Sequence, residues 1–314
     1  MEKEFQFINK DLKKSEKQTA LDKMTELNER SFQRMEGELE KTPDEIKSIN
    51  FANSLLQNEA LLELKIEIPE IKPEQIHIFS PEKYDNKFPN CVRSGYNAHH
   101  DSHSRAAYFK KNEDRVLFFN NMVHEMIHID EVHKYYFDKK SKLPQLYRIG
   151  YQINDPRESI KKNYDQDIYE SNKKLGLMHE AIVQKMSKDI IQKNADKFIE
   201  ELELSPEETN KSYGYNLYDC MIDIMDRAAA EIAKKKGESP DAVWKRLKRG
   251  LFTGEMMHLR DLEKYVDQGL LNKLARLKSL ADMDRKLPKK LTESEIEIDG
   301  KKYKVKYGGV YATD

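Results

Sequence analysis

The chain has 314 residues, and its 55 Lys and Arg residues nearly balance its 56 Asp and Glu residues, giving a formal net charge of −1 at pH 7. This balance excludes the strong single-signed field with which many proteins attract nucleic acids or membrane surfaces. No stretch approaches the roughly 18 apolar residues of a membrane-spanning helix, and the first residues lack the apolar run of a secretory signal. Cys91 and Cys220 form no CxxC pair, which favours a reducing compartment. We therefore expect a cytoplasmic protein that binds neither nucleic acid nor a membrane.

The N-terminal part divides into two segments. Residues 1–40 are charged and poor in aromatic residues, which predicts a mobile or loosely helical leader. Residues 41–140 are expected to form a subdomain with a small sheet. Its first helix should start at the capping box Thr42-Pro43-Asp44-Glu45 and run toward Leu62. Strand-like runs follow at 63–68, 75–79 and 106–109, and Asn112 is the expected cap of the next helix.

The C-terminal part is expected to be mostly helical. A polar stretch at 141–174 predicts an irregular insertion, and residues 175–288 predict a helical subdomain. Residues 289–314 alternate around Asp299-Gly300, which is typical of a β-hairpin. The expected fold class is therefore α+β, predominantly helical. The first C-terminal helix should bury a stripe of apolar residues, namely Leu175, Met178, Ile182, Met186 and Ile190.

The most informative segment for the chemical function of the chain is His124-Glu125-Met126-Ile127-His128. Four residues make slightly more than one helical turn, so both imidazoles project from one face with the Glu125 carboxylate beside them. The rest of the helix from 116 to 129 is almost entirely apolar and should be buried. A buried stripe of polar groups is costly unless those groups are paired or hold a metal. The pattern predicts His124 and His128 as ligands of Zn²⁺.

Catalytic zinc usually takes three protein ligands, so a third must come from elsewhere. Glu180 is the leading candidate, because it lies one turn from Gln184 beside the apolar stripe of a later helix. His133 and Glu131 are alternatives, although His133 falls on the far side of the helical wheel and Glu131 suits an outer position better. The cluster from His99 to His103 is either a solvated loop, or a cleft wall or accessory metal site.

HExxH followed on a later helix by a glutamate ligand resembles the gluzincin metallopeptidases, the thermolysin-like group. Their glutamate follows an asparagine, whereas His179 precedes Glu180 here. Tyr213-Gly214-Tyr215 and the segment 251–254 are similar to the helical subdomain of uncharacterised bacterial zincins, so the resemblance covers about residues 60 to 280. It implies a zincin-like fold with a small N-terminal sheet, an HExxH helix and a helical C-terminal subdomain. It also implies an oxyanion donor downstream, for which Tyr213 or Tyr215 is the candidate, with His179 behind them.

The leading hypothesis is a zinc metallopeptidase that acts on peptides or proteins. Zinc lowers the pKa of bound water from about 16 to near 7, and Glu125 would act as general base and return the proton to the leaving amine. Gln184 would orient a ligand imidazole from behind. The strand at 106–109 would form the cleft edge and pair with an extended substrate.

Three other functions fit the same residues. One is a zinc hydrolase of a non-peptide bond, since the same constellation can open an epoxide or an amide. Another is a non-catalytic interaction protein stabilised by zinc, which a fourth protein ligand would favour. The last is a helical adaptor without metal. The sequence does not encode the substrate preference, the oligomeric state or the biological role.

Overall fold

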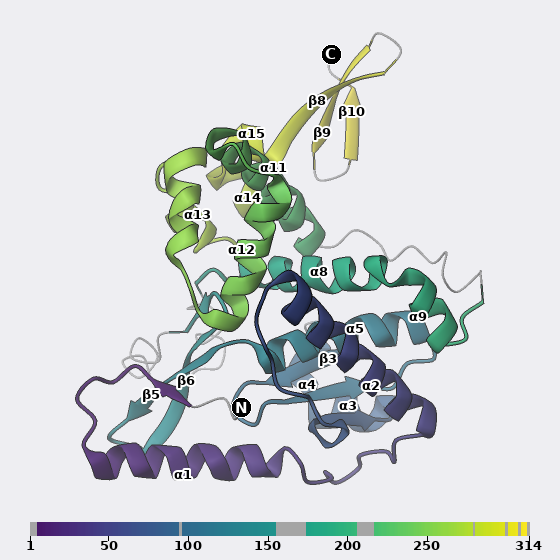
Figure 1. Cartoon of the computed structure of the whole chain (residues 1–314), viewed down its shortest axis with the longest axis vertical. Coiled ribbons are helices and arrows are strands. Elements are labelled where there is room, and N and C mark those ends of the chain that lie inside the picture. Colours follow the sequence, from purple (N-terminus) through teal and green to yellow (C-terminus); the bar gives the residue numbers. More distant parts are fainter. Residues whose placement is uncertain are drawn as a thin grey trace.

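The chain is a mixed α+β protein, and in the part that the structure describes helices predominate over three small sheets (Figure 1). The computed structural model describes residues 5–93, 96–154, 174–205, 217–278, 280–298, 301–306 and 309–312. The N-terminal elements are β1 (Gln6–Phe7), α1 (Lys14–Arg30), α2 (Pro43–Asn58), the π-helix η1 (Glu59–Glu63), the 3-10 helix η2 (Pro73–Gln75), β2 (Ile76–Phe79), α3 (Pro81–Lys87), α4 (Pro89–Arg93), β3 (Ala98–Asp101), β4 (Ala106–Lys110) and α5 (Arg115–Asp130). Then come β5 (His133–Asp138), β6 (Leu143–Ile149), β7 (Gln152–Ile153), α8 (Gly176–Lys193), α9 (Ala195–Glu201), α11 (Leu217–Lys236), α12 (Pro240–Thr253), the 3-10 helix η3 (Met257–Leu259), the π-helix η4 (Leu262–Val266), α13 (Leu270–Leu274), α14 (Leu280–Lys286), α15 (Lys289–Thr292), β8 (Glu293–Ile298), β9 (Lys301–Lys306) and β10 (Gly309–Ala312).

The sheet beside the HExxH helix has the order β2-β4-β3. β4 runs parallel to β2 and antiparallel to β3, so β4 is the central strand and β3 the edge. The expectation that residues 106–109 form the cleft edge is therefore wrong. The pairing of His100 with Ala107 covers that side of β4 and brings β3 against α5 instead.

The HExxH helix α5 is held by its cap and by its apolar side chains. The Asp114 carboxylate accepts the N–H of Leu117 at 3.0 Å and caps the helix. The expected cap, Asn112, lies two residues too early, and its side chain accepts the N–H of Asp114 at 2.9 Å. Burying one large aliphatic or aromatic side chain stabilises a fold by about 1.5–3 kcal/mol, so α5 is anchored deep in the core. Its buried apolar residues are Val116, Phe119, Met122, Val123, Met126, Ile127 and Ile129.

α5 lies between α2, β3 and α8, and α8 in turn packs on α11 and α12 (Figure 1). The predicted apolar stripe of α8, from Leu175 to Ile190, is buried as expected. A buried lysine also joins α12 to α8 and η1. Nζ of Lys248 on α12 lies 2.7 Å from Asp189 of α8 and 3.7 Å from Glu59, the first residue of η1. Apolar packing and this ion-pair network therefore fix α8 beside α5.

Several other expectations can be compared with the structure. The capping box at Thr42 starts α2, strands β2 and β4 lie where predicted, and β8 and β9 form the expected antiparallel pair, to which β10 adds a third strand. The predicted strand at 63–68 is wrong, because α2 continues into η1 through Glu63. The leader is docked, since β1 pairs with β5 and α1 buries Ala20 and Met24.

The expected irregular insertion at 141–174 is also wrong in its first part, because residues 143–149 and 152–153 form β6 and β7. Alternate positions of β6 are buried, and two of these buried positions are Pro144 and Arg148. They interrupt the alternation of apolar and polar residues, so the strand could not be recognised in the sequence. Residues 155–173 lie outside the described residues.

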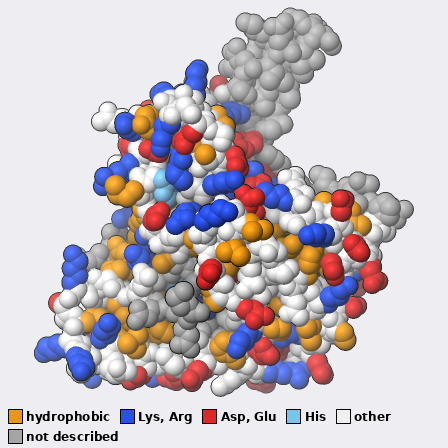
Figure 2. Space-filling model, in the orientation of Figure 1, with side chains coloured by type: hydrophobic (Ala, Val, Ile, Leu, Met, Phe, Trp, Pro, Cys, Tyr) orange, Lys and Arg blue, Asp and Glu red, His pale blue; other side chains and the backbone are white. Residues whose placement is uncertain are grey.

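The described helices include none that is long and apolar enough to cross a bilayer. Acidic and basic side chains are intermingled over the face shown in Figure 2, in keeping with the near-zero net charge. The described strands β8, β9 and β10 project from the helical part of the molecule (Figure 1).

A buried carboxylate joins the segment after α1 to the central sheet. Glu38 lies 2.8 Å from Nδ1 of His77 on β2 and 2.9 Å from Nζ of Lys41, and it accepts the N–H of Met35 at 2.9 Å. Burial alone would raise the pKa of Glu38, but the contacts with His77, Lys41 and the Met35 amide lower it from 4.5 to about 2. The ionised carboxylate is therefore favoured by the folded state.

We predict that Glu38→Gln destabilises the protein on the order of 3 kcal/mol at pH 7, because it breaks a buried ion pair. A carboxyl whose pKa is lowered on folding stabilises above its unfolded value, and that contribution is lost as pH falls from 4.5 toward 2. The difference in unfolding free energy between wild type and variant should therefore shrink across this window. Urea unfolding at several pH values measures it, with exposed Glu40→Gln as the control. A difference independent of pH would contradict the assignment.

Candidate metal centre

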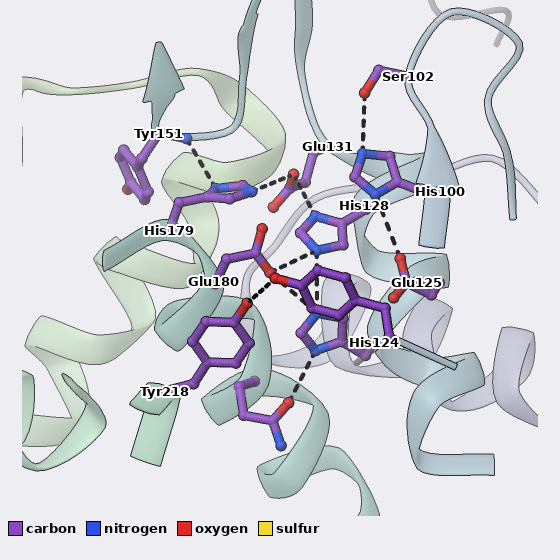
Figure 3. Close-up of polar contacts among 12 residues, drawn as sticks. His100, Ser102, His124, Glu125, His128, Glu131, Tyr151, His179, Glu180 and Tyr218 are labelled. Carbon is purple, nitrogen blue, oxygen red and sulfur yellow. Dashed lines mark hydrogen bonds and ion pairs between the residues drawn. The ribbon is translucent and has the colours of Figure 1, made fainter. Parts of the chain in front are cut away.

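Three donor atoms from two neighbouring helices form a nearly equilateral triangle (Figure 3). The Nε2 atoms of His124 and His128 on α5 lie 3.2 Å apart, and Oε2 of Glu180 on α8 lies 3.4 Å from each. In a tetrahedral zinc site with bonds of about 2.0–2.1 Å, adjacent ligand atoms are about 3.3–3.4 Å apart. The spacing and the chemistry of these donors therefore fit a zinc ion.

Two of the three side chains of the triangle are partly exposed to solvent. The side chain of His128 is only 2 % exposed, whereas those of His124 and Glu180 are 12 % and 24 % exposed. Burial would raise the pKa of Glu180, but the charge of His128 and the contacts with both imidazoles hold it well below its usual value. The same carboxylate and that of Glu131 raise the pKa of His128 well above its usual value, against the effect of burial. The carboxylates near the three donor atoms therefore favour a positive charge at the centre of the triangle.

Both imidazoles are held through their other ring nitrogen. Nδ1 of His124 lies 3.0 Å from Oε1 of Gln184, and Nδ1 of His128 lies 3.2 Å from Oε2 of Glu131. The amide oxygen of Gln184 only accepts, so Nδ1 of His124 is the donor in that pair. Burial raises the pKa of Glu131 to about 7, and its ionised form accepts from Nδ1 of His128. The Nε2 lone pairs are then directed toward the centre of the triangle, as a metal requires. Gln184 therefore lies where the sequence predicted, behind a ligand imidazole.

A second layer supports Glu131. Its Oε2 also lies 3.3 Å from Nε2 of His179, and the N–H of Tyr151 donates to Nδ1 of His179 at 3.3 Å. A backbone amide can only donate, so the neutral ring carries its proton on Nε2, facing Glu131. His179 is buried on this side, so the expectation that it could act as an oxyanion donor is wrong. Its ring instead lies behind Glu131, whose carboxylate contacts His128.

The general-base candidate Glu125 faces the edge strand β3. Its Oε2 lies 3.4 Å from Nδ1 of His100, whose Nε2 lies 3.0 Å from Oγ of Ser102. Burial and the charge of His128 lower the pKa of His100, so the ring is neutral near pH 7. Burial would raise the pKa of Glu125, but the contact with His100 and the nearby imidazoles lower it, which keeps the carboxylate ionised.

A tyrosine pair lies on the Glu180 side of the triangle. The Tyr218 side chain projects from α11 toward Glu180, and its hydroxyl lies 3.2 Å from that of Tyr96 (Figure 3). Burial and the charge of Glu180 raise the pKa of Tyr218, so its hydroxyl stays protonated and can donate. Tyr213 and Tyr215, the predicted donors, lie outside the described residues. Tyr218, three residues after Tyr215 and near the start of α11, was not among the predicted donors.

The remaining candidates take other positions. His133 lies on β5, and its Nε2 contacts the backbone oxygen of His128 at 3.1 Å, away from the triangle. Glu131 follows the last turn of α5 with an extended backbone, and its carboxylate contacts His128 from outside the triangle. This is the outer position that the sequence predicted. The interpretation of the 99–103 cluster as a solvated loop is wrong, because β3 includes His99 and His100 and both are half-buried.

A search of family models, of curated proteins and of solved structures found no match to this chain.

We predict that Gly150→Ala is more destabilising than an equivalent change elsewhere. Gly150 has φ +47°, and a Cβ there would lie 2.6 Å from Cε1 of His179 and 3.1 Å from Cδ of Glu131. Gly237 has φ +68° but open space around it, so it is a matched control. Gly237→Ala should cost about 1 kcal/mol for backbone strain, and Gly150→Ala about 3 kcal/mol because packing is also disrupted. Equal losses in urea unfolding would argue against tight packing behind His128.

Proposed function

We propose that the protein is a zinc-dependent metallopeptidase of the gluzincin type that hydrolyses peptide bonds of peptide or protein substrates. The main support is the triangle of His124, His128 and Glu180, whose edges fit tetrahedral zinc and whose third donor comes from a later helix. Neither Cys91 nor Cys220 forms a disulfide, which is compatible with a cytoplasmic location.

The number of donors favours a catalytic site over a structural one. Structural zinc is usually closed by four protein ligands, whereas catalytic zinc keeps one position for water or substrate. Among the residues that the structure describes, the group that contains His124, His128 and Glu180 has no fourth His, Cys, Asp or Glu. The partial exposure of Glu180 supports an open position on that side.

The chain's own residues supply the remaining chemistry. A zinc ion held by His124, His128 and Glu180 would act as a Lewis acid and make hydroxide available near neutral pH. Glu125 follows the first ligand in the sequence, and its ionised carboxylate would accept the proton of the attacking water and deliver it to the leaving amine. The Tyr218 hydroxyl, on the Glu180 side of the site, would donate to the oxygen of the scissile carbonyl as it gains negative charge.

We expect one zinc per chain in the purified wild type and none in Glu180→Ala under the same conditions. Loss of an outer partner alone weakens metal binding about 10–100-fold, so loss of a ligand should exceed that and Gln184→Ala should fall within it. Gln192→Ala, an exposed change on the same helix, is the matched control. Elemental analysis and chelator competition measure both effects. Wild-type zinc content in Glu180→Ala would remove Glu180 from the ligand set.

We expect Glu125→Gln to keep its zinc and to lower peptide turnover by about 10²–10⁴-fold, because the amide cannot accept the proton. Hydrolysis of casein and of quenched fluorescent peptides measures turnover, and a chelator should abolish it in the wild type. Glu113→Gln, an exposed change just before α5, is the control. If the zinc-loaded wild type cleaves no peptide, a hydrolase of another bond or a non-catalytic zinc protein takes precedence.

We expect Tyr218→Phe to lower kcat by about 10²-fold with little change in KM, because loss of one oxyanion donor acts mainly in the transition state. Tyr96→Phe is the comparison variant, since Tyr96 is exposed and its hydroxyl contacts that of Tyr218. Equal effects of the two changes would indicate that the tyrosine pair only orders the rim of the site.

A further inference from the structure

His100 is the residue of the edge strand that reaches the reacting groups. Its ring stacks on that of His128, with centroids 4.4 Å apart and an interplanar angle of 21°. Its two nitrogens contact Oε2 of Glu125 and Oγ of Ser102 (Figure 3). The ring is therefore held on one face by a ligand and at both nitrogens by polar partners.

The backbone around His100 is also fixed. His100 pairs with Ala107 of the central strand β4. The turn that follows is closed by Asp101, which accepts the N–H of His103 at 3.1 Å and the hydroxyl of Ser104 at 2.7 Å. The backbone oxygen of Ser102 accepts the hydroxyl of Tyr135 at 2.7 Å. Ser102 and His100 are thus presented to Glu125 by a rigid strand end.

The partners determine where the ring proton lies. Nδ1 lies 3.4 Å from Oε2 of Glu125 and Nε2 lies 3.0 Å from the Ser102 hydroxyl, so the ring is placed to donate through Nδ1 to the carboxylate. Nε2 is then an acceptor, and the Ser102 hydroxyl is the group beside it that can donate. Ser102, His100 and Glu125 form a directed chain of two donors that ends on the carboxylate.

We propose that His100 is a positioning residue that holds Oε2 of Glu125 through its Nδ1–H, with its tautomer set by Ser102. Oε1 of Glu125 is then the oxygen left to accept the proton of water. The kinetic consequence rests on the proposed peptidase function, whereas the proton arrangement in the chain does not.

The same order of groups, hydroxyl to imidazole to carboxylate, occurs in serine hydrolases, where the hydroxyl is a nucleophile. The geometry here favours positioning instead. Ser102 is only 8 % exposed, and its carboxylate partner belongs to the HExxH motif. A nucleophile must be reached by the substrate carbonyl, whereas a residue that sets a tautomer is best buried.

Two substitutions separate the nitrogens of the ring. The amide nitrogen of Asn superimposes on Nδ1 of His, and that of Gln on Nε2. His100→Asn therefore keeps a donor toward Glu125, and His100→Gln places its donor toward Ser102. In the zinc-loaded protein we expect His100→Gln and His100→Ala to lower kcat by about 10–100-fold with KM and zinc content unchanged, and His100→Asn to stay within about threefold of wild type.

A spectroscopic measurement tests the proton arrangement without turnover. Long-range ¹H–¹⁵N spectra of the full chain labelled with ¹⁵N-histidine, at pH 7 with zinc, report which nitrogen of each ring is protonated. The resonances that disappear in His100→Asn identify His100, and we expect its Nδ1 to be the protonated nitrogen.

The outcomes separate the alternatives. A proton on Nε2 of His100, or equal kcat values for His100→Asn and His100→Gln, would overturn the positioning role. Labelling of Ser102 by a fluorophosphonate probe would overturn it in favour of a serine nucleophile. If the wild type cleaves no peptide, the proposed function fails, and the spectra alone still decide whether His100 holds Glu125.

Discussion

The packing of α8 against α5 is the constraint on which the candidate site depends. Two imidazoles one turn apart on a helix are set by local geometry, but the carboxylate of Glu180 reaches them only because an apolar stripe of α8 is buried beside the apolar face of α5. The core therefore provides the free energy that holds these partly desolvated polar groups 3.2–3.4 Å apart. Without a cation between them, such groups are costly to bury.

Around this triangle, His124 and Glu125 have partners from other elements, and His128 contacts the C-cap residue of its own helix. Gln184 belongs to α8, Glu131 to the segment after α5, and His100 to the edge strand β3. A partner from another element restricts the rotation of a ring more than a neighbour on the same helix can. The site is thus preorganised in orientation and in tautomer, which reduces the reorganisation that a bound ion or a reacting substrate would require.

Local signals predicted much of this molecule. The capping box at Thr42, the periodic stripe of α8 and the HExxH spacing each concern residues close in sequence, and the corresponding elements are observed. Contacts set by tertiary pairing were harder to predict. Which strand forms the sheet edge depends on the pairing of β3 with β4, so the role of His100 was not apparent from a histidine-rich cluster. β6 was missed because Pro144 and Arg148 occupy buried positions, and Tyr218 because many tyrosines compete for one role.

The wide sequence spacing of the triangle also orders events during synthesis. Glu180 follows His128 by 52 residues (180 − 128), so a chain emerging from the ribosome exposes both histidines before the carboxylate exists. A pair of imidazoles alone offers too few ligands for tight zinc binding. Closing the intervening segment also costs entropy, which the packing of α8 on α5 must first offset. If the protein binds zinc as proposed, tight binding would therefore follow the packing of α8 on α5 rather than precede it.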